Sequence, residues 1–208
     1  TGEVKFKADA NEADNIFNID GNYNYKKDSS ENQLDINLYA GRLNLNILEP
    51  YLGTVFSEME GIVHSDLKLY GGAGNFYLTG KATIDSGSLT VDYTKCKYLF
   101  TNETVTFKKN EIDLGRMKLK DTLNNSGSVS GKINHRFFRD FSFDNVRFET
   151  GKLLLLNTSK KDNSQFYGNV TGDALMTLNG PLTNLVMTID GQPSIFDSSH
   201  IYLPTGSS

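Results

Sequence analysis

The residue types that could do chemistry are few in this 208-residue chain, and they stand far apart. The three histidines, His64, His135 and His200, have none of the short spacings at which two imidazoles bind one metal ion. Cys96 is the only cysteine, so neither a disulfide nor a cysteine-based metal site forms within the chain. We therefore predict no catalytic residue, no metal site and no cofactor.

The glycine-rich segment 71–74 has the composition of a phosphate-binding loop without its spacing. Such a loop has a glycine five positions before its Gly-Lys pair, and the residue five positions before Gly80 is Asn75. Lys81 is followed by Ala82 instead of the serine or threonine that meets Mg²⁺. The residues that follow alternate as in a strand, so no helix N-terminus is present to bind phosphate. We interpret the segment as a wide hairpin turn, and we predict neither enzymatic activity nor nucleotide binding.

Most of the chain consists of short segments with an apolar side chain at every second position. We count about sixteen of them, separated by Gly, Asn and Asp turns such as 70–75, 85–87 and 108–111. A period of two places the apolar side chains on one face of each strand. The sequence thus predicts one continuous all-β domain over residues 1–208, an antiparallel sheet with one apolar side.

One segment departs from this period. Residues 47–59 carry apolar side chains at every third or fourth position, which is the stripe of an amphipathic helix. Pro50 suits the first turn of a helix and Gly61 suits its end. We expect a helix over about 49–60 that packs on the sheet as a lid.

Charge and hydrophobicity exclude some classes of partner. The formal net charge is -4, and no basic patch is visible, so we predict no nucleic-acid binding. The chain has neither an apolar run of membrane-spanning length nor a signal-peptide pattern. Because it begins at Thr1, we expect a piece of a longer protein whose anchor or export signal lies upstream.

The extent of the apolar side suggests a function. Open sheets of more than about ten strands tend to curl or split, and about sixteen strands would extend roughly 75 Å. One helix does not cover such a face, so we predict an elongated, curled sheet with a hydrophobic trough that suits acyl chains. A collapsed two-layer sandwich and an outer-membrane barrel with its apolar side outward are the alternatives. The predicted lining residues are Leu67, Leu69, Phe76, Leu78, Ile84, Leu89, Val91, Val105, Phe107, Ile112, Leu114, Val129, Ile133, Phe141, Phe143, Leu153, Leu155, Leu185, Met187 and Ile189.

Several stretches resemble the TamB family (translocation and assembly module TamB, AsmA-like), in the version found in Bacteroides-type bacteria. They are residues 43–52, 67–71, 135–141, 166–172, 178–185 and 201–204. Each stretch is a loose motif, and their order along most of the chain makes the resemblance more specific. The chain departs from the family pattern before Gly80, where the expected proline is absent.

The resemblance implies a taco-like curled sheet in a periplasm-spanning protein, anchored in the inner membrane by a segment outside this chain. It implies that phospholipid, or another acyl-chain lipid, moves along the hydrophobic groove between the inner and outer membranes. It also implies an alternative function, the assembly of outer-membrane β-barrel proteins by strand addition, with a BamA-like (TamA-like) partner.

Overall fold

The computed structural model describes residues 2–12, 15–25, 33–53, 56–72, 74–137 and 139–203. Twelve strands within these residues form one sheet, and every neighbouring pair is antiparallel, which confirms the predicted all-β class. The strands are β1 (Glu3–Glu12), β2 (Asn15–Asn24), β3 (Leu34–Asn44), β4 (Phe56–Gly72), β5 (Asn75–Val91), β6 (Cys96–Lys108), β7 (Glu111–Asp121), β8 (Ser126–Arg136), β9 (Arg139–Thr158), β10 (Tyr167–Pro181), β11 (Val186–Pro193) and β12 (His200–Tyr202). Three short helical turns join them: η1 (Leu45–Leu48), α1 (Glu49–Leu52) and η2 (Leu182–Asn184).

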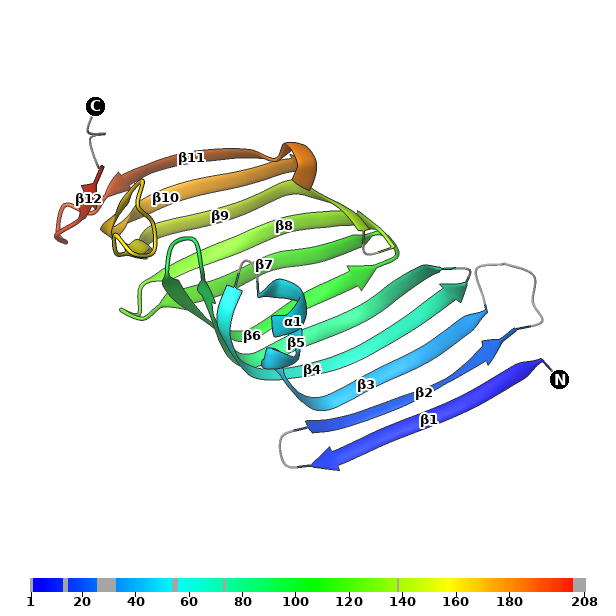
Figure 1. Ribbon diagram of the computed structural model, residues 1–208. Coiled ribbons are helices and arrows are strands. Elements are labelled where there is room, and N and C mark those ends of the chain that lie inside the picture. The colour runs from blue at the N-terminus through cyan, green and yellow to red at the C-terminus, as the bar shows by residue number, and fades with distance from the viewer. Residues whose placement is uncertain are drawn as a thin grey trace.

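The sheet is an open meander. Its strands lie in sequence order from β1 to β11, and β12 pairs with β10 beyond the end of β11. Figure 1 shows one twisted layer, with β1 at one edge and β11 and β12 at the other. Consecutive strands joined by short turns explain this order, since antiparallel neighbours need only a hairpin between them.

The strands are fewer and longer than the sequence indicates. The expected turn at 85–87 is wrong, because these residues lie inside β5, a strand of 17 residues. Ile62 pairs with Ser86 and Val63 pairs with Ile84, so Asp85 is an extra residue without a partner in β4. Such a bulge shifts the alternation of apolar side chains, and one strand then reads as two.

The amphipathic helix expected over 49–60 is wrong. The described residues of this segment form one α-helical turn, at whose end the backbone N–H of Gly53 donates to the Glu49 carbonyl oxygen. Residues 54–55 lie outside the described residues, and Phe56 already pairs with Val91 of β5. Pairing with β5 provides ladder hydrogen bonds for residues from Phe56 onward, which outweighs a weak helical preference.

One end of the sheet is curled upon itself. The backbone N–H of Asn157, near the end of β9, donates a 2.8 Å hydrogen bond to the carbonyl oxygen of Thr94 in the β5–β6 turn. The rings of Tyr93 and Phe166 meet edge to face, with centroids 5.8 Å apart. We call this region the closed end, defined by its buried cluster of Cys96, Tyr98, Phe100, Met117, Leu119, Leu153 and Leu154.

Candidate functional site

An unbroken row of apolar residues and glycines crosses the sheet. Directly paired residues of antiparallel strands share one face, so the register identifies the members of this row. We call it the apolar row: Ala8, Ile19, Leu38, Leu67, Gly80, Phe107, Ile112, Ile133, Phe143 and Gly180, one residue from each of β1 to β10. At ~4.8 Å between strands, the row extends roughly 43 Å.

The opposite face carries a matching polar row. Its members are Asp9, Asn18, Tyr39, Asp66, Lys81, Thr106, Asp113, Lys132 and Asp144, which are also paired directly from β1 to β9. Lys108 beside this row donates to Glu111 and Asp113 at 2.6 and 2.9 Å, and these bonds lower the pKa of both carboxyls. Apart from Tyr39, the two rows, one residue apart, therefore differ in polarity, as expected for a sheet with one apolar and one solvent-facing side.

At the closed end, the protein's own side chains fill the apolar face. The Tyr98 hydroxyl donates to the Leu154 carbonyl oxygen at 2.9 Å, and the Leu154 N–H donates to Asp121 Oδ2 at 2.8 Å. Burial raises the pKa of Tyr98 and of Cys96, so both stay protonated. The members of this cluster pack against one another.

The twenty predicted lining residues divide into four groups. Leu153 is 0% exposed and belongs to the closed end, out of reach of a ligand. Seven more pack against that cluster: Ile84, Leu89, Val91, Val105, Leu114, Val129 and Leu155. Nine lie on strands β4 to β9 outside the cluster, half-buried or, for Phe76, exposed: Leu67, Leu69, Phe76, Leu78, Phe107, Ile112, Ile133, Phe141 and Phe143.

The last three predicted residues lie at the β11 edge. Leu185 follows η2 and is half-buried, whereas Met187 and Ile189 are exposed. Met187 pairs with Leu178 and Ile189 with Met176, so both share a face with these β10 residues. They are exposed because no strand follows β11 among the described residues.

The N-terminal strands contribute to the same face, although the lining list omits them. Ile19, Leu38 and Ala8 belong to the apolar row, and Phe6, Ile36 and the row's neighbours Leu69 and Leu78 form a second paired series through Gly21. The alternation of apolar residues in 4–8 and 34–38 is the signal that identifies them. It is as clear there as in the later strands.

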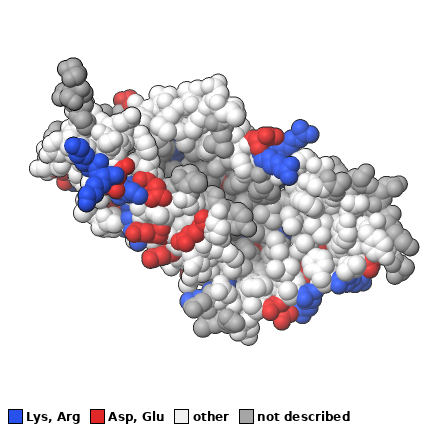
Figure 2. All heavy atoms as spheres, viewed as in Figure 1, with Lys and Arg blue, Asp and Glu red and all other residues white. Residues whose placement is uncertain are grey.

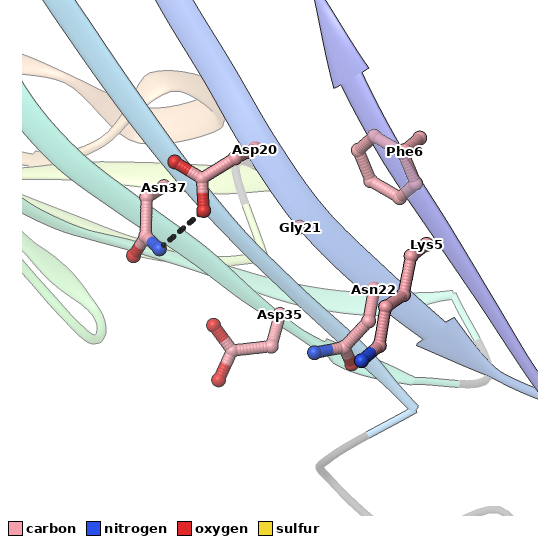
Figure 3. A pocket seen from close by; sticks show the side chains of 7 residues that line it. All are labelled: Lys5, Phe6, Asp20, Gly21, Asn22, Asp35 and Asn37. Atoms are coloured by element: carbon pink, nitrogen blue, oxygen red, sulfur yellow. Dashed lines mark hydrogen bonds between the residues drawn. The ribbon is translucent and has the colours of Figure 1, made fainter.

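A shallow notch lies on the polar face over the backbone of Gly21 (Figure 3). Asp20, Asp35, Asn22, Asn37 and Lys5 surround it. Asn37 donates to Asp20 at 3.1 Å, and outside the figure Lys68 forms a 2.9 Å ion pair with Asp35. The polar groups thus pair with one another, as in a solvated surface.

No cluster of three or more metal-ligating His, Cys, Asp or Glu side chains is present in the part of the chain that the structure describes. Figure 2 shows charged side chains gathered in separate groups, with broad uncharged surface between them. The feature most able to bind a ligand is therefore the apolar face itself.

Comparisons with known proteins leave the family open. No family model matches the chain, and neither a curated protein nor a solved structure matches it. Among the described residues, the helices are too short to span a membrane.

Proposed function

We propose that this chain is a segment of a TamB-like protein of the periplasm that carries phospholipid acyl chains along the apolar face of its sheet. The observation that carries the proposal is the apolar row, which continues across ten strands while the opposite face is polar. An apolar path perpendicular to the strands suits a hydrocarbon chain. An inner-membrane anchor outside this chain is part of the proposal.

In this mechanism the curl of the sheet makes the apolar face the inside of a taco-like trough. Acyl chains lie against the apolar row, and their headgroups stay in water along the open side. Each buried methylene contributes roughly 0.8 kcal/mol, so ten of them contribute about 8 kcal/mol before ordering costs. The closed end excludes lipid from one side of the face, which directs the chains toward the half of the strands bearing Leu78 and Phe107.

The test measures lipid that co-purifies with the protein. The protein is purified from cells, its lipids are extracted, and mass spectrometry gives the molar ratio of lipid to protein. Leu78→Asp introduces a charge on the apolar face, and Thr79→Asp, the matched control, introduces it one residue later on the polar face opposite Lys68. We expect Leu78→Asp to lose at least about tenfold of the bound lipid because a buried charge opposes hydrocarbon, and Thr79→Asp to keep it.

Circular dichroism confirms that both variants are folded before the comparison. Absence of lipid from the folded wild type, or equal lipid in Leu78→Asp and wild type, contradicts the proposal. Leu89 is a poor position for this test, because it packs against the closed end and its substitution would unfold the protein.

A second function, assembly of outer-membrane barrel proteins with a BamA-like partner, is favoured by the two sheet edges. Among the described residues β1 pairs only with β2 and β11 only with β10, so one side of each strand has backbone groups available for an added strand. The readout is the rate at which an outer-membrane barrel protein refolds into vesicles with and without this chain. Faster refolding that is retained with Leu78→Asp and lost with Thr188→Lys, a substitution on the edge strand β11, supports this function over lipid carriage.

A further inference from the structure

Large exposed apolar side chains concentrate at the β11–β12 edge. Eight of the eighteen such residues among the described ones fall within the last eighteen positions: Val186, Met187, Ile189, Ile195, Phe196, Ile201, Tyr202 and Leu203. The extremes are Ile195 and Phe196, which are 89% and 88% exposed. A concentration of this kind marks a surface that contacts an apolar partner.

These two residues stand on a loop that hydrogen bonds hold in shape. The loop, residues 194–199, connects β11 to β12. Within it, Ser194 Oγ donates to Asp197 Oδ2 at 2.6 Å, and the Phe196 N–H donates to Ser194 Oγ at 3.2 Å. Lys152 of β9 forms a 2.9 Å ion pair with the same Asp197 oxygen. The only carboxylate of the loop is therefore paired.

Both ends of the 194–199 loop are attached to one residue of β10. The Ser194 N–H donates to the Thr171 carbonyl oxygen at 2.8 Å. Ser199 Oγ donates to that same oxygen at 3.0 Å and accepts from the Thr171 N–H at 3.1 Å. Thr171 is buried, so the loop is fixed to the sheet interior. The exposure of Ile195 and Phe196 is thus built into the loop and is not the result of a loose segment.

The side chains at the tip of the loop, Ile195 and Phe196, and those around them suit a lipid surface. Two large side chains exposed on all sides need surroundings that enclose them, which fluid acyl chains provide and a flat protein patch does not. Tyr202 of β12 stacks on Tyr167 of β10, with ring centroids 5.1 Å apart, and tyrosine favours the membrane–water boundary. No Lys or Arg occurs in residues 186–203, so attraction to anionic lipid is not the driving force.

We propose that the 194–199 loop inserts Ile195 and Phe196 into the boundary between headgroups and acyl chains of a lipid bilayer. The insertion docks the β11–β12 edge of the sheet on the membrane. It uses residues outside the apolar row and stands whether or not that row carries lipid. Because the contact is apolar, it is insensitive to salt and does not require anionic headgroups.

The chain contains no tryptophan, so one introduced tryptophan reports its own surroundings without interference. The probe is a vesicle of zwitterionic phosphatidylcholine, with or without bromine on its acyl chains. We expect the emission of Phe196→Trp to shift to the blue on vesicle addition and to fall about twofold or more with brominated lipid. Leu123→Trp is the matched control, since Leu123 is a 62% exposed apolar residue in the β7–β8 turn; its emission should not change.

Vesicle flotation supplies the second measurement. Ile195→Asp should reduce the floated fraction at least about tenfold, because a charge at the tip opposes entry into hydrocarbon, and Leu123→Asp should not. An unchanged Phe196→Trp emission with vesicles overturns the proposal. So does a blue shift that depends on protein concentration without vesicles, since this indicates contact between proteins. If Leu78→Asp loses its co-purified lipid but its 194–199 loop still inserts into vesicles, membrane docking by this edge is independent of lipid binding on the apolar face.

Discussion

The Tyr98 hydroxyl lies 2.9 Å from the carbonyl oxygen of Leu154, although β7 and β8 separate their strands within the sheet. The carboxylate of Asp121 holds the N–H of the same leucine at 2.8 Å. A flat sheet cannot bring Tyr98 of β6 or Asp121 of β7 to Leu154 of β9, so these two bonds exist only because the sheet curls. The curl in turn divides the apolar face into a filled part at the closed end and a part open to solvent or to a ligand.

Removing the Tyr98 hydroxyl tests the strength of this contact. Tyr98→Phe leaves the ring in place and leaves the buried Leu154 carbonyl without its donor, so we expect the free energy of unfolding to fall by about 1–2 kcal/mol. Urea denaturation followed by circular dichroism measures the change. Tyr93→Phe is the control, because Tyr93 is 67% exposed and its ring contact does not need the hydroxyl. Equal urea midpoints for wild type and Tyr98→Phe would show that the hydrogen bond from Tyr98 to Leu154 does not stabilise the fold.

The thiol of Cys96 reports the opening of the closed end. Cys96 is 0% exposed, and burial raises its pKa, so the native protein should react slowly with an aromatic disulfide reagent at pH 8. If labelling requires opening of the Tyr98–Leu154 contact, Tyr98→Phe should accelerate it about fivefold for each 1 kcal/mol lost. Ser126→Cys, at an exposed position, gives the unprotected rate. A Cys96 rate equal to that of Ser126→Cys in the folded protein would show that the closed end is accessible.

The period of two was enough to predict the all-β class of the fold. It works because pleated strands alternate by geometry, as in the pairs Leu69–Leu78 and Ile112–Ile133. Strand number was overestimated, because bulges such as the one at Asp85 change the phase of the pattern inside a strand. The predicted helix is wrong for a related reason. A short apolar stripe fits both the helical period of 3.6 and the strand period of two, and the pairing of Phe56 with Val91 shows that this part of the segment is a strand.

The extent of the open face could not be derived from the sequence. Tyr98 and Leu154 are 56 residues apart, and no local pattern indicates that they meet. Leu153 therefore looked like any other alternating apolar residue, although it is fully buried. The 194–199 loop was missed as well, since exposure of Ile195 and Phe196 depends on hydrogen bonds to Thr171 and Lys152. Long-range packing, and not residue type, separates core from surface here.

Gly80 is required for the close approach of β4 to β5. Its φ is +122°, and a Cβ there would lie 2.1 Å from the Asp66 carbonyl oxygen. Gly80→Ala therefore combines backbone strain with a clash against main chain, and we expect a loss of about 2 kcal/mol or more in unfolding free energy. Gly151→Ala is the matched control, since a Cβ there meets nothing within 4 Å, and it should change stability by less than about 0.5 kcal/mol. Similar losses in the two variants, measured by urea denaturation, would contradict the strain at Gly80.

His135 should determine how the free energy of unfolding changes with pH between about 7.5 and 5. Its side chain is 5% exposed, and burial lowers the pKa of the imidazole below the value of about 6.5 that it has in the unfolded chain. The unfolded state therefore binds a proton first as the pH falls. The contribution of His135 to stability is complete above about pH 6.5 and is lost as the pH falls toward the folded-state pKa, by up to about 1.4 kcal/mol per pH unit.

His135→Gln should flatten the dependence of unfolding free energy on pH in this window, whatever its effect on stability at pH 7.5. His64→Gln, which replaces an exposed histidine of β4, is measured alongside as the control. The window stays above the range in which Glu111 and Asp113 titrate, because Lys108 lowers the pKa of both. Their ion pairs therefore persist throughout, and a His135→Gln slope equal to that of the wild type would locate the proton uptake elsewhere.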